Sequence, residues 1–148
     1  METISIFTGR SASKKDLAGM VKQLRGHWQS HRDRDGKLFE EGVVQGQGSS
    51  HVFIYVEENV LVDFEREAVS QVEVDGIGLI LGKPPLSVVH IAIGHGKGSN
   101  ELAFSVADLI AKRFEGIIVF GGMKWMEELY EAGEGRSKHV LSIRIQKD

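Results

Sequence analysis

The sequence predicts a single α/β domain of the α+β sandwich type, in which a mixed sheet of five to six strands carries at least two packed helices. Short runs rich in Val, Ile and Phe recur between glycine-containing turns, which is typical of strands in a compact domain. Residues 99–114 show helical periodicity between two such runs. A chain of 148 residues is long enough to bury one core, and its two prolines are adjacent, so no proline-rich linker divides residues 1–148.

Residues 85–122 show the clearest structural pattern, and the other elements are assigned relative to them. Residues 87–93 are dominated by Val and Ile and predict a buried strand, and residues 94–98 contain three glycines and predict a loop. We expect the helix that follows to have Ser99 as its N-cap and Gly116 in the left-handed position after its end. Residues 117–120 then form a strand, and such a strand–helix–strand unit predicts a right-handed parallel crossover.

The N-terminal half predicts one helix and three strands. Residues 3–8 predict the first strand, and Ser13 and Asp16 have the spacing of a capping box for a helix that keeps an apolar face as far as Trp28. His27 and His31 then stand at i and i+4, a spacing that can offer two metal nitrogens, although no third ligand accompanies them. Residues 33–36 predict a turn, and residues 38–45 and 51–57 predict an antiparallel hairpin.

The C-terminal half is less regular between residues 59 and 81. A helix near residues 65–72 competes there with a hairpin turn at Asp75 and Gly76, and the residue pattern before Pro84 and Pro85 leaves both open. Residues 123–132 predict a further helix, and residues 139–146 alternate strictly and predict a strand with one buried face.

Composition excludes several functional classes. The formal net charge is −3, from 18 basic and 21 acidic side chains, so no general field attracts nucleic acid, and we expect no direct nucleic-acid binding. Cysteine is absent, which excludes thiol catalysis and cysteine zinc sites. No apolar run approaches the ~18 residues that span a bilayer. We therefore expect a cytoplasmic protein that has no membrane segment, metal or cofactor.

The loop between the predicted strand and helix carries the sharpest chemical pattern. A glycine loop that opens a helix can hold an anion with free backbone amides; its residues here are Gly94, His95, Gly96, Lys97, Gly98 and Ser99. The loop departs from the nucleotide-triphosphate pattern at Ile91 and Gly98. It resembles the acetyl-CoA pyrophosphate loop of GNAT-type N-acetyltransferases through Gly96 and Gly98, with Ile93 where that family carries Gln or Arg. The alternative interpretation is a chain reversal that needs glycine for its geometry.

Two histidines near this loop have different expected roles. His90 lies inside the predicted strand, where a hydrogen-bonded core histidine is the expected interpretation. His95 lies beside Lys97 on the loop and is the better acid–base candidate if the loop is catalytic. No catalytic residue is assigned, and we do not expect an enzyme.

Residues 65–122 also carry a resemblance. Nine positions contribute to it: Leu81, Gly82, Pro85, Ala111, Phe114, Gly116, Phe120, Gly121 and Gly122. Through these residues the chain resembles small bacterial immunity proteins that neutralise polymorphic or contact-dependent toxins. This resemblance implies an antitoxin-like inhibitor that covers the active site of a cognate toxin, of which a nuclease is one expected class. The same resemblance favours a helix near residues 65–72, before Pro84 and Pro85.

An inhibitor of a nuclease is expected to carry charge opposite to the substrate-binding cleft of its target. The candidate partner-binding residues form an acidic run: Glu57, Glu58, Asp63, Glu65 and Glu67. A second acidic run lies further along the chain: Glu127, Glu128, Glu131 and Glu134. A solvated surface is the alternative role for both runs.

Overall fold

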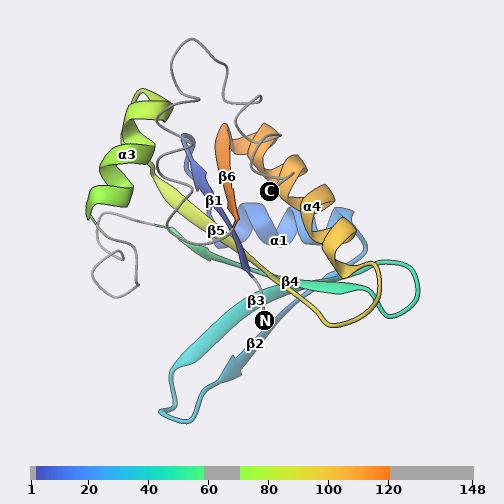
Figure 1. Cartoon of the computed structure of the whole chain (residues 1–148). Coiled ribbons are helices and arrows are strands. Elements are labelled where there is room, and N and C mark those ends of the chain that lie inside the picture. The colour runs from blue at the N-terminus through green and yellow to red at the C-terminus, as the bar shows by residue number, and fades with distance from the viewer. Residues whose placement is uncertain (1–2, 59–70, 121–148) are drawn as a thin grey trace.

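The computed structural model describes residues 3–58 and 71–120, which form six strands and three helices (Figure 1). In chain order these are β1 (Thr3–Thr8), α1 (Lys14–Gln23), β2 (His27–Arg32), β3 (Leu38–Gln45), β4 (His51–Glu57), α3 (Gln71–Leu81), β5 (Ser87–Ile93), α4 (Ser99–Phe114) and β6 (Gly116–Phe120). The strands make one sheet in the order β2-β3-β4-β5-β1-β6. The α+β class and the predicted number of strands are confirmed.

The described strand pairs are all antiparallel, which differs from the expected mixed sheet. β5 and β6 do run in the same direction, as the predicted crossover requires, but β1 lies between them and pairs with both. The reason is that β1 is apolar on both faces: Ile4 and Ile6 are buried on one face and Phe7 on the other, so the strand fits the centre of the sheet.

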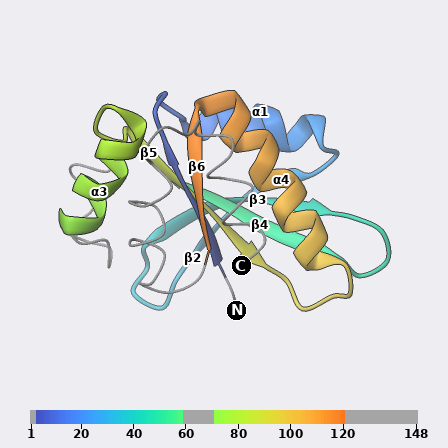
Figure 2. The ribbon, with the colours of Figure 1, turned by 45° about the horizontal axis from the view of Figure 1, so that its top comes forward.

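One face of the sheet is covered by α1 and α4, which lie side by side while α3 lies apart from them (Figure 2). Alternate residues of the central strands point into this layer. Its largest fully buried side chains include Ile4, Ile6, Leu17, Ile54, Ile91 and Ile110. Burial of this apolar set is the main stabilising contribution to the fold.

The predicted capping box at the start of α1 is confirmed. The Asp16 amide donates to the Ser13 hydroxyl at 3.1 Å, and the Ser13 amide donates to the Asp16 carboxylate at 3.2 Å. These bonds to Ser13 favour the ionised carboxylate and lower the pKa of Asp16 from its ordinary value.

The expected extension of this helix to Trp28 is wrong. α1 ends at Gln23, Arg25 takes a left-handed conformation with φ of 62°, and β2 begins at His27. The chain turns here because Gly26 packs so closely on the Val43 carbonyl that a side chain would overlap it. His27 and His31 therefore lie on a strand and not on a helix face.

The ends of α4 also differ from the expectation. Gly98, at φ of 89°, is the N-cap, and Ser99 is the first helical residue. At the other end Glu115, at φ of 52°, takes the left-handed position that was expected of Gly116. Gly116 is instead the first residue of β6, where a Cβ would crowd the Ile6 side chain.

The remaining sequence predictions divide into confirmed ones and ones outside the described residues. The turn at residues 33–36 and the β3–β4 hairpin are confirmed. α3 confirms a helix before the two prolines and excludes the hairpin at Asp75 and Gly76. The helix start at residues 65–70, the helix at 123–132 and the strand at 139–146 lie outside the described residues. Among the described helices none is both long and apolar enough to cross a membrane.

Candidate functional site

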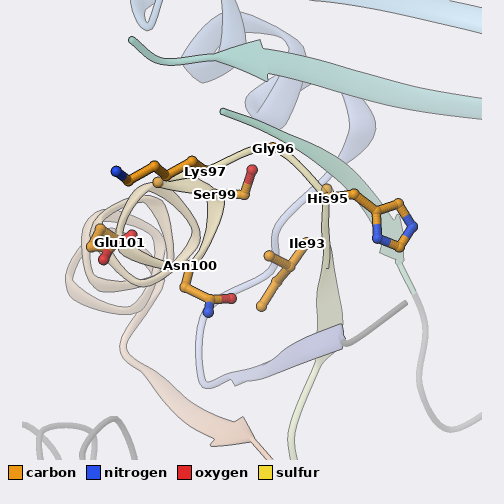
Figure 3. Close-up of a pocket in the computed structure, with 9 residues that line it drawn as sticks. Ile93, His95, Gly96, Lys97, Ser99, Asn100 and Glu101 are labelled. Carbon is orange, nitrogen blue, oxygen red and sulfur yellow. The ribbon is translucent and has the colours of Figure 1, made fainter. Parts of the chain in front are cut away.

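The loop from β5 to α4 borders a hollow of ≈ 480 Å³ that is lined by residues 93–101 (Figure 3). The loop is fixed against the turn between β3 and β4. Gly96 lies so close to the Ser49 carbonyl that a Cβ would overlap it, and the His51 amide donates to the Ser99 hydroxyl at 3.1 Å. The glycines therefore serve a close backbone approach, as the chain-reversal interpretation requires.

The side chains of this loop do not converge on one point. Ser99 is 2% exposed and is bonded to β4, whereas His95 and Lys97 are exposed and point in opposite directions (Figure 3). The Ser99 amide at the start of α4 already donates to the Gly96 carbonyl at 3.1 Å, so an anion in the hollow would depend on the amides that follow it and on the Lys97 ammonium group. His95, the predicted acid–base candidate, lies away from Lys97.

The described part of the predicted acidic run does not form a single surface. The Glu57 carboxylate lies 2.9 Å from His90, and its side chain is 11% exposed. The Glu58 carboxylate accepts a hydrogen bond from the Lys14 amide at 2.7 Å, at the start of α1. Asp63, Glu65 and Glu67, and the second acidic run from 127 to 134, lie outside the described residues.

A polar line across three neighbouring strands was not predicted from the sequence. His90 on β5 lies 3.0 Å through Nδ1 from the Ser5 hydroxyl on β1, and 2.9 Å through Nε2 from Glu57 on β4. Its ring stacks on Tyr55 with centroids 4.9 Å apart. The prediction of a hydrogen-bonded core histidine is thereby confirmed.

The Ser5–His90–Glu57 line has the order of groups found in hydrolytic triads. All three residues lie within strands, and their side chains are on the face of the sheet opposite α1 and α4. The second carboxylate oxygen of Glu57 is buried and has no hydrogen-bond partner among residues 3–58 and 71–120. The contact with His90 is therefore the main compensation for burying this carboxylate, and the line acts as a polar clamp across the sheet. The described residues contain no group of three or more His, Asp or Glu side chains that could hold a metal ion.

The β2–β3 hairpin projects away from the helix-covered part of the sheet (Figure 1). Its outer half, residues 29–41, is called the arm below. Two large apolar side chains of the arm are exposed: Leu38 by 52% and Phe39 by 43%. Because they are successive residues of β3, their side chains lie on opposite faces of the arm, so a partner that covers both faces of the arm would bury both of them.

The arm is held in shape by its own contacts. Gln29 donates to the Glu41 carboxylate at 3.0 Å, and the rings of His31 and Phe39 stack at 5.7 Å. At its tip, one carboxylate oxygen of Asp33 accepts from the amides of Asp35 and Lys37, both at 2.9 Å.

Comparison of the chain with protein-family models, curated protein sequences and solved structures found no match.

Proposed function

We propose that this protein binds and blocks another protein, in the manner of an immunity protein that inhibits a cognate toxin. The observation that supports this most directly is the arm, which presents Leu38 and Phe39 to solvent beyond the packed body of the molecule. Exposed apolar side chains on a projecting hairpin gain free energy when a partner removes them from water.

The order of the arm favours tight binding. A flexible loop loses conformational entropy when a partner fixes it, and this loss opposes association. The Asp33 turn, the Gln29–Glu41 hydrogen bond and the stacking of Phe39 on His31 hold the arm before any partner arrives. The arm therefore has less entropy to lose on binding than an unstructured segment of equal length.

In this proposal the arm, rather than the predicted acidic residues Glu57 and Glu58, contacts the partner. Glu57 is directed at His90 and Glu58 at the Lys14 amide, so neither carboxylate is free to meet a basic cleft without giving up its present contact. Glu40 and Glu41 also lie on the arm, but Glu40 is paired with Lys14 at 2.8 Å and Glu41 accepts from Gln29 at 3.0 Å. The proposed contact therefore depends on the exposed apolar side chains of the arm rather than on its carboxylates.

The first test is the neighbouring reading frame, which the proposal expects to encode a toxin domain, and the second is growth rescue against that domain. Co-expression of the wild-type chain should restore growth, and a variant with both Leu38→Ser and Phe39→Ser should lose this protection because its apolar anchors are gone. Leu79→Ser is the matched control, since Leu79 is 70% exposed but lies on α3. Calorimetry with a catalytically inactive toxin domain should give the same order of affinities.

Two outcomes would contradict the proposal. One is absence of binding between the wild-type chain and the neighbouring toxin domain. The other is full protection by the arm variant, which would assign inhibition to a different surface.

A second candidate function is anion binding at the glycine loop, favoured by the hollow at residues 93–101 and by the Lys97 ammonium group beside the start of α4. Calorimetry with acetyl-CoA and with nucleotides tests it. Micromolar binding that Lys97→Gln weakens and the control Lys15→Gln on α1 preserves would favour this function. Heat changes no larger than dilution for every ligand would exclude these ligands.

A further inference from the structure

The outer edge of β2 pairs with no other strand that the structure describes. In the described part of the chain β2 pairs only with β3, and its residues Ser30, His31 and Arg32 are exposed. β2 carries no proline, and its register with β3 is continuous over all six residues, so no bulge turns it away. Natural proteins normally protect such an edge because its free amides and carbonyls can pair with another strand.

The hairpin geometry identifies which backbone groups point outward. The Asp33 amide donates to the Lys37 carbonyl at 3.0 Å, so residues 33 and 37 form a hydrogen-bonded pair at the tip. Hydrogen-bonded and non-hydrogen-bonded pairs alternate along an antiparallel ladder. In the observed register, the amides and carbonyls of Trp28, Ser30 and Arg32 therefore face away from β3.

We propose that two copies of this chain associate through β2, which pairs antiparallel with β2 of a second copy about a twofold axis at Ser30. In this register Ser30 pairs with Ser30 of the second copy, and Trp28 pairs with Arg32 of the second copy. All three outward-facing residues of each strand then find partners, which joins the two sheets into one. The inference does not depend on the proposed inhibitory function.

The sequence of β2 and its flanks is self-complementary in charge in this register. Arg25 of one copy approaches the tip of the other, where Asp33 and Asp35 lie, and His27 stands opposite Asp33. Arg32 stands opposite Trp28, an arrangement in which a guanidinium group can lie over an indole ring. Arg25 and Arg32 thus meet an opposite charge and an aromatic ring, respectively, whereas Arg34 at the tip stands opposite Gly26.

Neighbouring registers lack this match. A shift by two residues places His27 opposite His31 in one direction, and His31 opposite His31 in the other. Each shift also leaves one of the three outward-facing residues of each strand without a partner. Only the register centred on Ser30 combines the full set of backbone hydrogen bonds with complementary charge, which favours a second copy over an unrelated acidic strand.

The charge is available for such a contact. The Arg32 guanidinium donates to the Gly36 carbonyl at 2.8 Å, a neutral acceptor, and neither Arg25 nor Arg32 has a carboxylate within ion-pair distance among the described residues. The carboxylates across the hairpin are already engaged, Glu40 with Lys14 at 2.8 Å and Glu41 with Gln29 at 3.0 Å. The edge of β2 therefore carries uncompensated positive charge, and the tip of the second copy supplies the carboxylates.

Sedimentation equilibrium of the full chain from low micromolar to near-millimolar concentration tests the proposal. The wild type should show a reversible monomer–dimer equilibrium that weakens as salt is raised. Ser30→Pro should abolish the dimer, because proline removes an outward-facing amide that makes no hydrogen bond to any residue the structure describes. Ser30→Ala is the matched control and should dimerise like the wild type, and circular dichroism checks that both variants are folded.

A charge exchange provides a second test that does not depend on proline. Arg25→Asp and Asp35→Arg should each weaken the dimer about tenfold, since each reverses two symmetric contacts. The two changes combined in one chain should restore wild-type affinity. Asp is tolerated at the left-handed position of residue 25.

The proposal is overturned if the wild type is monomeric at every concentration, if folded Ser30→Pro dimerises normally, or if the combined charge exchange fails to restore affinity. A monomeric wild type whose binding to a toxin domain is lost in Ser30→Pro would assign this edge to a strand of the toxin. A dimer that neither protects cells nor binds a toxin would support the dimer and contradict the proposed function alone.

Discussion

β5 and β2 are strands of similar length in one sheet, yet different forces hold them. β5 lies between β4 and β1, and Val88, Val89 and Ile91 on it are 0% exposed, so apolar burial on both faces fixes it. β2 lies at the sheet edge, and four of its six residues are exposed, so cross-strand polar contacts and one neighbouring strand fix it. The body of the molecule is therefore built for stability, whereas the edge and arm are available for contact.

Histidine shows the same difference. His90 on β5 has a partner on each ring nitrogen, Ser5 and Glu57, and its side chain is 12% exposed. His31 on β2 is 52% exposed and lies 3.8 Å from Glu41. Removing His90 leaves the buried Glu57 carboxylate without its hydrogen-bond partner, whereas removing His31 leaves a Glu41 carboxylate that water can solvate.

The largest expected effect is at the centre of β5. Ile91→Ala should lower the free energy of unfolding by about 2–5 kcal/mol, because it removes buried carbon atoms and leaves a cavity beneath α1 and α4. The measurement is urea unfolding, with a lower midpoint and an unchanged slope. Ser30→Ala on β2 is the control, and its change should stay within about 0.5 kcal/mol. Equal losses at the two positions would contradict the contrast between the strands.

The next effect concerns the polar clamp. His90→Leu should cost about 2 kcal/mol, because the Glu57 carboxylate would remain buried without its partner. Adding Glu57→Leu should recover part of this loss by removing the orphaned charge. A double variant whose loss equals the sum of the two single losses would show that the His90–Glu57 contact contributes nothing.

Local signals explain what the sequence predicts correctly. The composition of residues 87–93, the Ser13–Asp16 capping box and the turn at 33–36 each depend on neighbours within a few residues, and each is found in the structure. The core role of His90 follows from its apolar neighbours on the same strand. These features need no knowledge of which strands pair.

Long-range packing explains the features that the sequence does not predict. Ser5 and Glu57 reach His90 from 85 and 33 residues away, and only the observed register of β1, β5 and β4 brings them together. The helix pattern continues to Trp28, but close packing of Gly26 on β3 ends the helix earlier. The insertion of β1 between β5 and β6 is likewise a property of the whole sheet, which strand composition alone does not specify.

A small increase in the free energy of unfolding is expected for a change at Arg25, just before β2. Arg25 is a non-glycine residue at φ of 62°, so Arg25→Gly should raise the free energy of unfolding by up to about 1 kcal/mol. Thermal unfolding at concentrations where the chain is monomeric measures this. Lys22→Gly, inside α1, is the control and should be destabilising by about 1 kcal/mol. Destabilisation by Arg25→Gly would mean that the Arg25 side chain makes a contact worth more than its backbone strain.

The smallest expected effect is the contact between Gln29 and Glu41 on the arm. A double-mutant cycle with Gln29→Ala and Glu41→Ala should give a coupling of about 0.5 kcal/mol, because cross-strand polar pairs near solvent are only slightly better than hydration. The same cycle between His90 and Glu57 is the control and should give a clearly larger coupling, because water cannot replace the lost partner in a buried site. If the two couplings were equal, burial would not be what separates β5 from β2. The order of the arm would then depend on contacts other than the backbone hydrogen bonds between β2 and β3.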